Sequence, residues 1–473
     1  MIEIGRNSTV IRNVDLESTE YKRFRNWFSL YDKVTHKYTF SAFTVIDNDI
    51  YIPTSVTEDS IKSFFPKKSV TKNYKTTAKS EQIDFVMKHN PRDDLQKQAI
   101  DFLLKMKNDG DCRARFLSLA TGSGKTYVTI NVISSMKKRA LIIVDTAELA
   151  AQWKREFLNH TNLNDSDIRI LSGAESIQKE EKTSDGKIYI AIHRTLGNLL
   201  SEDTNALNRL MNKLKIGVRV FDESHVDFGN ICRINSLSNV MFTIFLTATP
   251  SRSNFNDNSL YGKIFKSIPY FNGKDISNEK YHTVVMYKIN TNPGIDAKFS
   301  VKTKYGFSSA RWASYIHDDG FENFIDAFDK IMERFKILSG DKKTAILLPT
   351  IELIKKVKEC IEEDNPTIEI GTFIGEVKKE KRHDELSKQL ILTNDKIFDK
   401  GIDVKDLEIV INFVPFGSVV KTEQIMGRLR YNEGKSAILI DVTDTGFEEC
   451  VKQSKIRKRF YKKKAKRIFE GNN

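Results

Sequence analysis

The chain has 473 residues, of which 40% are hydrophobic and 29% charged, and its formal net charge is +13. At roughly 100–200 residues per domain, this length predicts about three domains, and the positive excess favours a polyanionic partner. The four cysteines are widely spaced without a CxxC pair, which argues against a zinc or disulfide framework. No apolar run approaches the ~18 residues of a membrane span, and no signal peptide is evident. The sequence therefore predicts a cytoplasmic protein without membrane contact.

Residues 1–88 are expected to form a small α+β domain. The stretch Tyr38–Ile52 is rich in aromatic and β-branched residues and predicts a hairpin with its turn at 47–49. Six lysines and no acid follow between Lys62 and Lys79. Two interpretations stay open: the domain binds duplex DNA through these lysines and exposed aromatic residues, or the aromatic residues are core and the lysines a solvated loop. The aromatic residues concerned are Trp27, Phe40 and Phe43.

From residue 89 onward, short apolar runs alternate with segments of helical periodicity, which predicts doubly wound parallel sheets. The expected parts are a first lobe over 89–250, a connector over 251–336, a second lobe over 337–445 and a basic helix or tail over 446–473. The runs lie at 140–144, 188–192, 218–221, 242–246, 344–348, 388–392, 407–411 and 436–440. In the connector, Arg311 and Trp312 could form a strand-separating wedge, or Trp312 could pack into the lobe. The basic tail could hold duplex phosphates or be a solvated helix face.

A glycine-rich loop at 120–126 separates a predicted strand at 116–119 from a predicted helix at 126–136. Glycines let the backbone N–H groups face phosphates beside a helix N-terminus. Lys125 is expected to bind the β- and γ-phosphates of ATP, and Thr126 to place its hydroxyl on Mg²⁺. The loop residues expected at the nucleotide are Thr121, Gly122, Ser123, Gly124, Lys125 and Thr126.

An acidic box, Asp222-Glu223-Ser224-His225, follows the predicted strand 218–221. A carboxylate at this end of a strand in the same sheet can meet the metal of a bound nucleotide. Asp222 is expected to hold Mg²⁺, and Glu223 to activate the attacking water as general base. His225 is expected to link the ATP site to Thr247-Ala248-Thr249-Pro250, where Thr247 and Thr249 could change partners when the γ-phosphate leaves.

The glycine-rich loop, the acidic box and the segment Thr247–Pro250 follow one another along the chain. With motifs in this order, residues of about 90–445 resemble the superfamily 2 DNA helicases with a DESH box. The resemblance implies two RecA-like lobes. It also implies that Gln96 reads adenine, that Gly401 and Asp403 touch the nucleotide, and that Gln424 couples the sites. Arg428 would act as an arginine finger on the transferring phosphoryl group, with Arg430 beside it. The implied nucleic-acid contacts, which grip backbone rather than bases, are Thr146, Thr195, Thr350 and Thr393.

The segment Thr146–Phe157 (TAELAAQWKREF), the DESH box and the compact size look most like phage branch-migration and fork-remodelling helicases of the UvsW type. The expected function is that of an ATP-dependent, monomeric motor on single-stranded, forked or branched DNA, in replication, recombination or repair and in the host cytoplasm if phage-encoded. Alternatives are a DNA translocase for transcription termination or protein displacement, and an RNA helicase. A degenerate DNA-binding scaffold is disfavoured because the catalytic set is intact, namely Lys125, Asp222, Glu223 and Arg428.

Overall fold

A computed structural model describes residues 1–32, 35–74, 80–107, 114–119, 123–224, 227–238, 240–247, 255–273, 280–304, 306–377, 382–398, 404–429 and 437–472. The chain divides into two compact units, Met1–Asn278 and Glu279–Asn473. Over these described ranges, the strands form one five-stranded sheet, two seven-stranded sheets and two short hairpins. No helix in the described ranges is long and apolar enough to cross a bilayer.

The N-terminal sheet has the strand order β5-β6-β2-β1-β7. The predicted hairpin is present as β5 and β6, and Asp47 takes a φ of 53° in its turn. The earlier part of the predicted stretch, β4, pairs instead with β3. The elements are β1 (Ile2–Ile4), β2 (Ser8–Ile11), α1 (Thr19–Trp27), β3 (Ser29–Asp32), β4 (Lys37–Ser41), β5 (Thr44–Ile46), β6 (Asp49–Pro53), α2 (Glu58–Lys62) and β7 (Val70–Lys72).

The lobe-1 sheet is parallel throughout its described strands, with the order β10-β11-β9-β12-β13-β8-β14. These are β8 (Ala114–Ser118), β9 (Ala140–Val144), β10 (Ile168–Leu171), β11 (Ile188–Ile192), β12 (Val218–Phe221), β13 (Phe242–Thr247) and β14 (Tyr270–Asn272). One face packs on α3 (Asp94–Leu104), α4 (Lys125–Met136) and α5 (Ala147–His160). The other face packs on α6 (Ala174–Thr183), α7 (His193–Glu202), α8 (Ala206–Lys213), α9 (Phe228–Ser236) and α10 (Phe255–Phe265).

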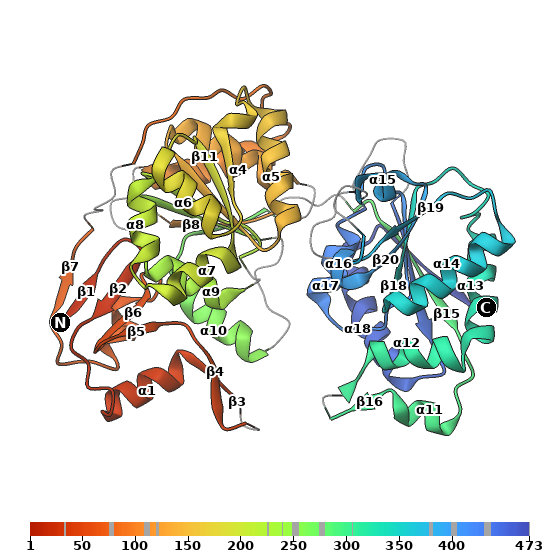
Figure 1. The fold of residues 1–473 in the computed structure, drawn as a ribbon. Coiled ribbons are helices and arrows are strands. Elements are labelled where there is room, and N and C mark those ends of the chain that lie inside the picture. The colour runs from red at the N-terminus through yellow and green to blue at the C-terminus, as the bar shows by residue number, and fades with distance from the viewer. Residues whose placement is uncertain are drawn as a thin grey trace. The chain divides into compact units, whose positions relative to one another are not determined.

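The N-terminal sheet shares its core with lobe 1 and lies beside α9, while the hairpin of β3 and β4 lies beside α10 (Figure 1). Phe43 is buried, and the ring of Phe40 lies 5.5 Å from that of Phe228. Asn7 is buried where the two parts meet: its side chain donates to Thr243 Oγ1 at 3.2 Å and accepts from the Val240 N–H at 2.9 Å. Phe40 and Phe43 therefore supply packing between the N-terminal region and lobe 1, whereas Trp27 is 51% exposed; the boundary at residue 88 stays a prediction.

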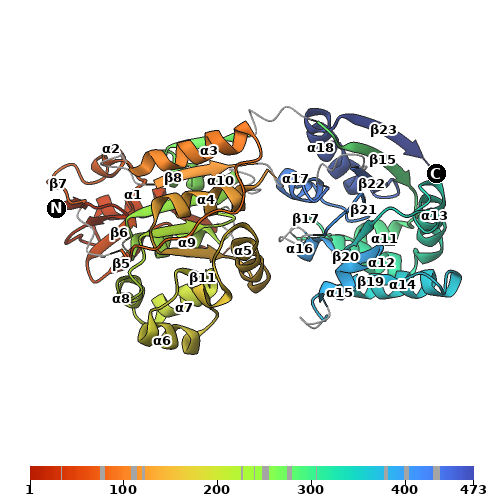
Figure 2. The same cartoon turned by 90° about the horizontal axis from the view of Figure 1, so that it is seen from above.

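The lobe-2 sheet is also parallel in its described strands, with the order β19-β20-β18-β21-β22-β15-β23. These are β15 (Thr283–Ile289), β18 (Thr344–Leu348), β19 (Ile370–Phe373), β20 (Leu390–Asn394), β21 (Ile409–Asn412), β22 (Ile438–Asp444) and β23 (Arg467–Asn472). Helices α12 (Ser309–Asp318), α13 (Phe321–Arg334) and α14 (Ile351–Asp364) pack on one face. The opposite face carries α16 (Asp395–Phe398), α17 (Val419–Met426) and α18 (Glu448–Lys464), as Figure 2 shows for α17 and α18.

The expected connector over 251–336 is not a separate part of the fold. Its first portion supplies α10 and β14 to lobe 1, whereas β15, α12 and α13 belong to lobe 2. Between β15 and α12 lie α11 (Ile295–Ser300) and the hairpin of β16 (Lys302–Thr303) and β17 (Gly306–Phe307). Trp312 is 1% exposed and donates its indole N–H to Asp444 Oδ2 at 3.1 Å, so it packs into the lobe and forms no wedge.

The C-terminal segment is also integrated, because β23 pairs with β15 and completes the sheet edge. The remaining helix of lobe 2 is α15 (Arg382–Ser387). On α18, Arg457 is buried and its Nε lies 2.9 Å from Asp441 Oδ2. The helix is therefore neither a free tail nor uniformly solvated: it buries one face and exposes lysines on the other.

The two lobes share one topology. Numbered along the chain within each lobe, both described sheets have the order 3-4-2-5-6-1-7. The correspondence extends to single backbone bonds, since the Asp222 N–H donates to Ile143 O at 2.9 Å and the Phe413 N–H donates to Leu347 O at 3.1 Å. The chain therefore repeats one α/β design, as the sequence predicted.

Asn7→Ala is expected to destabilise the first unit by about 1–3 kcal/mol, because the buried Val240 N–H loses its acceptor. Urea unfolding followed by circular dichroism measures the change. Lys67→Ala, at an exposed position, should stay within about 0.5 kcal/mol of the parent. A stability equal to that of Lys67→Ala would contradict the role of Asn7 in joining the N-terminal sheet to lobe 1.

Candidate ATP site and nucleic-acid interface

The glycine-rich loop ends where α4 begins at Lys125, preceded by Gly124 with a φ of 85°. The left-handed backbone favours glycine here, and a Cβ on Gly124 would lie 2.3 Å from Gln96 Nε2, so the Gln96 amide would have to shift. Gln96 is buried, donates from Nε2 to Ser123 O at 3.3 Å and accepts from the Arg92 N–H at 2.9 Å. Gln96 therefore lies against the loop, while Thr121 and Gly122 fall outside the described residues.

The predicted catalytic groups of lobe 1 lie together at the carboxyl ends of β8 and β12. Lys125 Nζ is 3.2 Å from Glu223 Oε1, and both side chains are largely buried. Glu223 has a φ of 44°, and its N–H donates to Asp222 Oδ1 at 2.9 Å. Burial raises the pKa of the Asp222 carboxyl and the Glu223 charge raises it further, whereas Lys125 and a hydrogen bond from Trp153 lower it.

The sequence did not reveal the partner of Trp153. This residue lies in the segment Thr146–Phe157, and its indole N–H donates to Asp222 Oδ2 at 2.7 Å. Its side chain is 2% exposed, on the face of α5 that also buries Leu149, Ala150 and Phe157. The apolar periodicity of α5 could have predicted burial, but no local pattern identifies the carboxylate that the N–H meets.

The residues present fit a nucleotide phosphate and a divalent cation. Lys125 and the half-buried Thr126 occupy the first turn of the twelve-residue helix α4, whose terminal N–H groups favour an anion. Asp222 and Glu223 supply carboxylate oxygens, the donors that Mg²⁺ prefers. No group of three or more His, Cys, Asp or Glu in the described part of the chain could hold a metal alone. This donor set fits a cation that is coordinated partly by these side chains and partly by phosphate oxygens of the nucleotide.

The expected switch residue Thr247 is the last residue of β13 and is fully buried. Its carbonyl accepts from the Leu119 N–H at 3.3 Å, directly before the glycine-rich loop. The Ser224 N–H of the acidic box donates to Leu246 O at 2.8 Å on the same strand. Thr247 therefore lies between the loop and the box, while His225 and Thr249 are outside the described residues.

Three of the four expected nucleic-acid contacts lie at helix N-termini. Thr146 precedes α5 and accepts from the Leu149 N–H at 3.2 Å, and Thr350 precedes α14 and accepts from the Leu353 N–H at 3.3 Å. Thr195 lies in the first turn of α7. Thr393 lies apart from these, because it is fully buried in β20 and its hydroxyl donates to Phe373 O at 2.7 Å; its contact with nucleic acid stays a prediction.

Two expected residues of lobe 2 lie at the end of α17. Gln424 is in the helix, Arg428 follows it, and both are half-buried. His282 Nε2 lies 2.9 Å from Met426 O and 3.0 Å from Leu429 O, so a ring protonated at Nε2 fixes the backbone on both sides of Arg428. No pattern in the sequence indicates this contact. Gly401, Asp403 and Arg430 are outside the described residues.

Acid is expected to destabilise lobe 2 through His282, because burial lowers its pKa from 6.5 to about 4. Below pH 6.5, His282 is protonated in the unfolded state and stays neutral in the folded state. The free energy of unfolding that is present above this pH is therefore lost as the pH falls toward 4. The slope from this group approaches about 1.4 kcal/mol per pH unit.

Urea unfolding at several pH values, read by hydrogen exchange in peptides from β15 and β22, measures this dependence. His282→Gln should flatten the profile between pH 6.5 and 4, whereas His317→Gln, with its exposed side chain, should follow the parent. Identical profiles for the parent and His282→Gln would contradict the assignment.

Comparisons with known proteins agree with this arrangement. Residues 88–252 match the family model described as type III restriction enzyme, res subunit. The chain is 25% identical to the DNA 3'-5' translocase XPB2 of Sulfurisphaera tokodaii over 75% of this chain and 81% of that protein. It is 24% identical to the transcript termination protein A18 of Yaba monkey tumor virus over 70% of this chain and 68% of that protein.

A solved structure of S. cerevisiae Dbp5 bound to RNA and ADP BeF3 has a TM-score of 0.54 at 12% identity. It covers 80% of this chain and 89% of that one, and it shows a common fold. The two lobes are therefore RecA-like, preceded by a small α+β region, and the fold class predicted from the sequence is confirmed. The chain is therefore an ATP-hydrolysing enzyme similar to DNA helicases and translocases.

Proposed function

We propose that this enzyme is an ATP-dependent DNA helicase or translocase that acts on forked or branched DNA, in replication, recombination or repair of the phage type. The observation that carries the proposal is the repeated design of the two lobes. In each lobe, a threonine two residues after the second strand caps a fourteen-residue helix: Thr146 precedes α5 and Thr350 precedes α14. Such helix N-termini bind phosphates without reading bases.

The equivalence of Thr146 and Thr350 supports a motor with one backbone grip on each lobe. The caps occupy corresponding positions because β9 and β18 correspond: Ile143 O on β9 accepts from the Asp222 N–H, and Leu347 O on β18 accepts from the Phe413 N–H. A strand held by two equivalent grips can be advanced when the grips alternate.

At the ATP site, we assign phosphate binding to Lys125 and the N-terminus of α4. An ammonium has three N–H donors, so Lys125 can retain Glu223 and also contact phosphate oxygens. Asp222 and Thr126 would hold Mg²⁺, which when bound neutralises charge on the phosphate oxygens. Glu223 would take the proton of the attacking water, and Arg428 would supply positive charge to the transferring phosphoryl group.

The exposed face of α18 supports a polyanionic partner. Lys455, Arg459 and Lys462 are exposed, whereas the opposite face is anchored through Arg457 and Tyr461. Because the buried face of this helix supplies the packing, its basic residues on the opposite face are free to contact phosphates. We propose it as an additional surface for the DNA backbone.

A DNA translocase for transcription termination or protein displacement is the second candidate. The similarity to the viral transcript termination protein, over 70% of this chain, favours it specifically. Both candidates use the same ATP-driven motor. They differ in the substrate, which is forked or branched DNA for the helicase and DNA carrying a transcript or a bound protein for the translocase.

ATP hydrolysis by the full chain is expected to rise at least about 10-fold on addition of DNA, because only a gripped strand completes the cycle. The assay compares single-stranded DNA, duplex, fork, four-way junction and RNA at one salt concentration. The strongest stimulation is expected with the fork and the junction. Equal stimulation by plain duplex would favour the translocase, and stimulation by RNA alone would contradict both candidates.

Lys125→Ala and Glu223→Gln are each expected to lower turnover at least about 100-fold, because they remove a phosphate contact and the general base. Binding of a fluorescent ATP analogue should persist in Glu223→Gln, whose change spares the phosphate loop. Glu202→Gln, at an exposed position on α7, is the matched control and should keep parental turnover. Full turnover in either site variant would refute the proposed chemistry.

A further inference from the structure

The Asp222 carboxylate is held by two donors from different elements. The Trp153 indole N–H donates to Oδ2 at 2.7 Å, and the Glu223 N–H donates to Oδ1 at 2.9 Å. Trp153 is 2% and Asp222 8% exposed, so little water competes for these bonds. Because each oxygen has its own fixed donor, the position of the indole determines the orientation of the carboxylate.

The pair of Trp153 and Asp222 occurs in the lobe that carries the glycine-rich loop, and the other lobe replaces both residues. The strand registers make Phe413 the counterpart of Asp222 and Val357 the counterpart of Trp153. Phe413 is 2% and Val357 0% exposed, within one apolar core. An aliphatic side chain therefore suffices for packing at this position, which indicates that the indole N–H serves the carboxylate.

One helix connects this indole to both of the proposed binding sites. Helix α5 begins after Thr146, the proposed backbone grip, and carries Trp153 about two turns later. At its other end, the ring of His160 packs edge-on against Tyr127 with centroids 5.2 Å apart. Tyr127 is the third residue of α4, directly after Lys125 and Thr126. A displacement of α5 would therefore move the hydrogen-bond donor of Asp222 and the ring that packs against the phosphate-loop helix α4.

We propose that Trp153 is a positioning residue that transmits nucleic-acid binding at the N-terminus of α5 to the Asp222 carboxylate, and thereby sets how strongly nucleic acid stimulates ATP hydrolysis. The inference rests on the proposed function. A strand bound at Thr146 pulls on α5, the indole N–H moves with the helix, and the carboxylate follows its donor. Trp153 acts through Asp222 and needs no contact with substrate.

Trp153→Phe tests the proposal, because it keeps an aromatic ring in the core and removes the N–H. Stimulation of turnover by forked DNA should fall at least about 10-fold, a factor typical of losing one hydrogen bond to a charged group. The Mg²⁺ concentration for half-maximal binding of a fluorescent ATP analogue should rise about 3- to 10-fold, the factor expected for the net loss of one ordinary hydrogen bond. The affinity for forked DNA should stay at the parental value.

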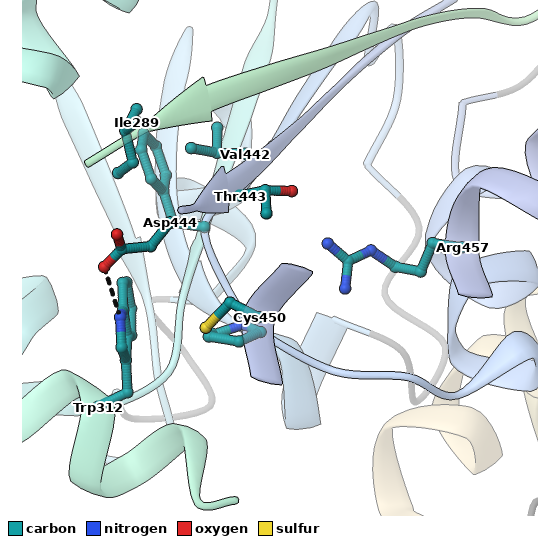
Figure 3. A pocket seen from close by; sticks show the side chains of 9 residues that line it. Ile289, Trp312, Val442, Thr443, Asp444, Cys450 and Arg457 are labelled. Atoms are coloured by element: carbon teal, nitrogen blue, oxygen red, sulfur yellow. Dashed lines mark hydrogen bonds between the residues drawn. The ribbon is translucent and has the colours of Figure 1, made fainter. Parts of the chain in front are cut away.

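Trp312→Phe is the matched control, since Trp312 makes the same kind of bond in lobe 2. Its indole N–H points at Asp444, as Figure 3 shows, at 3.1 Å from Oδ2, and its side chain is 1% exposed. The same substitution therefore removes an equivalent buried bond away from the proposed nucleotide site. The variant should retain parental stimulation and Mg²⁺ dependence, which separates positioning from general loss of stability.

A spectroscopic arm keeps the proposal testable even if Trp153→Phe folds poorly. The sequence has three tryptophans, so Trp27→Phe with Trp312→Phe leaves Trp153 as the single emitter. Forked DNA should shift its emission, and Thr146→Ala should reduce that shift.

Each outcome is distinct. A parental protein that DNA does not stimulate removes the proposed function and this inference together. A stimulated parent whose Trp153→Phe variant is equally stimulated, with the same Mg²⁺ dependence, overturns the inference alone. Absence of any DNA-induced change in Trp153 emission, with stimulation intact, overturns it as well.

Discussion

A carboxylate buried at the end of β12 needs hydrogen-bond donors, and the surrounding elements of lobe 1 supply them. Asp222 is 8% exposed, and a charge this far from water is tolerated only where donors surround it. The donors come from α5 through Trp153 and from the backbone of Glu223, whose own carboxylate meets Lys125 at the start of α4. The sheet, the phosphate-loop helix and the capped helix therefore meet at one group. In the proposed mechanism, this convergence lets events at either helix reach the site of hydrolysis.

The repeat of one topology explains how a single design serves two tasks. Both lobes retain a threonine cap after their second strand, at Thr146 and Thr350. At the position of the carboxylate, lobe 2 carries Phe413, and at the position of its indole partner it carries Val357. We infer that the caps serve the task common to both lobes, the grip on a phosphate backbone. The polar pair serves the task that we assign to lobe 1 alone.

Local patterns in the sequence predicted most strands and the residues that end them. The runs at 140–144, 188–192, 218–221 and 344–348 agree with β9, β11, β12 and β18, because a buried parallel strand is a continuous apolar run. Integration of β15 and β23 was missed because their pairing depends on each other and on β22, far along the chain. The partners of Trp153, His282 and Thr393 were missed for the same reason: periodicity predicts that a side chain is buried, while tertiary pairing decides what it meets. The residues of the candidate site that lie on one loop or strand end were accessible to sequence reasoning, and those that support them from other elements were not.

We infer that ATP hydrolysis moves this chain along DNA. Displacement of a third strand from a DNA triplex tests that claim directly, because the third strand leaves only when a motor travels along the duplex. ATP-dependent displacement is expected from the parental protein and none from Lys125→Ala, at equal DNA occupancy. Vigorous DNA-stimulated ATP hydrolysis without displacement, from either direction of approach, would contradict it.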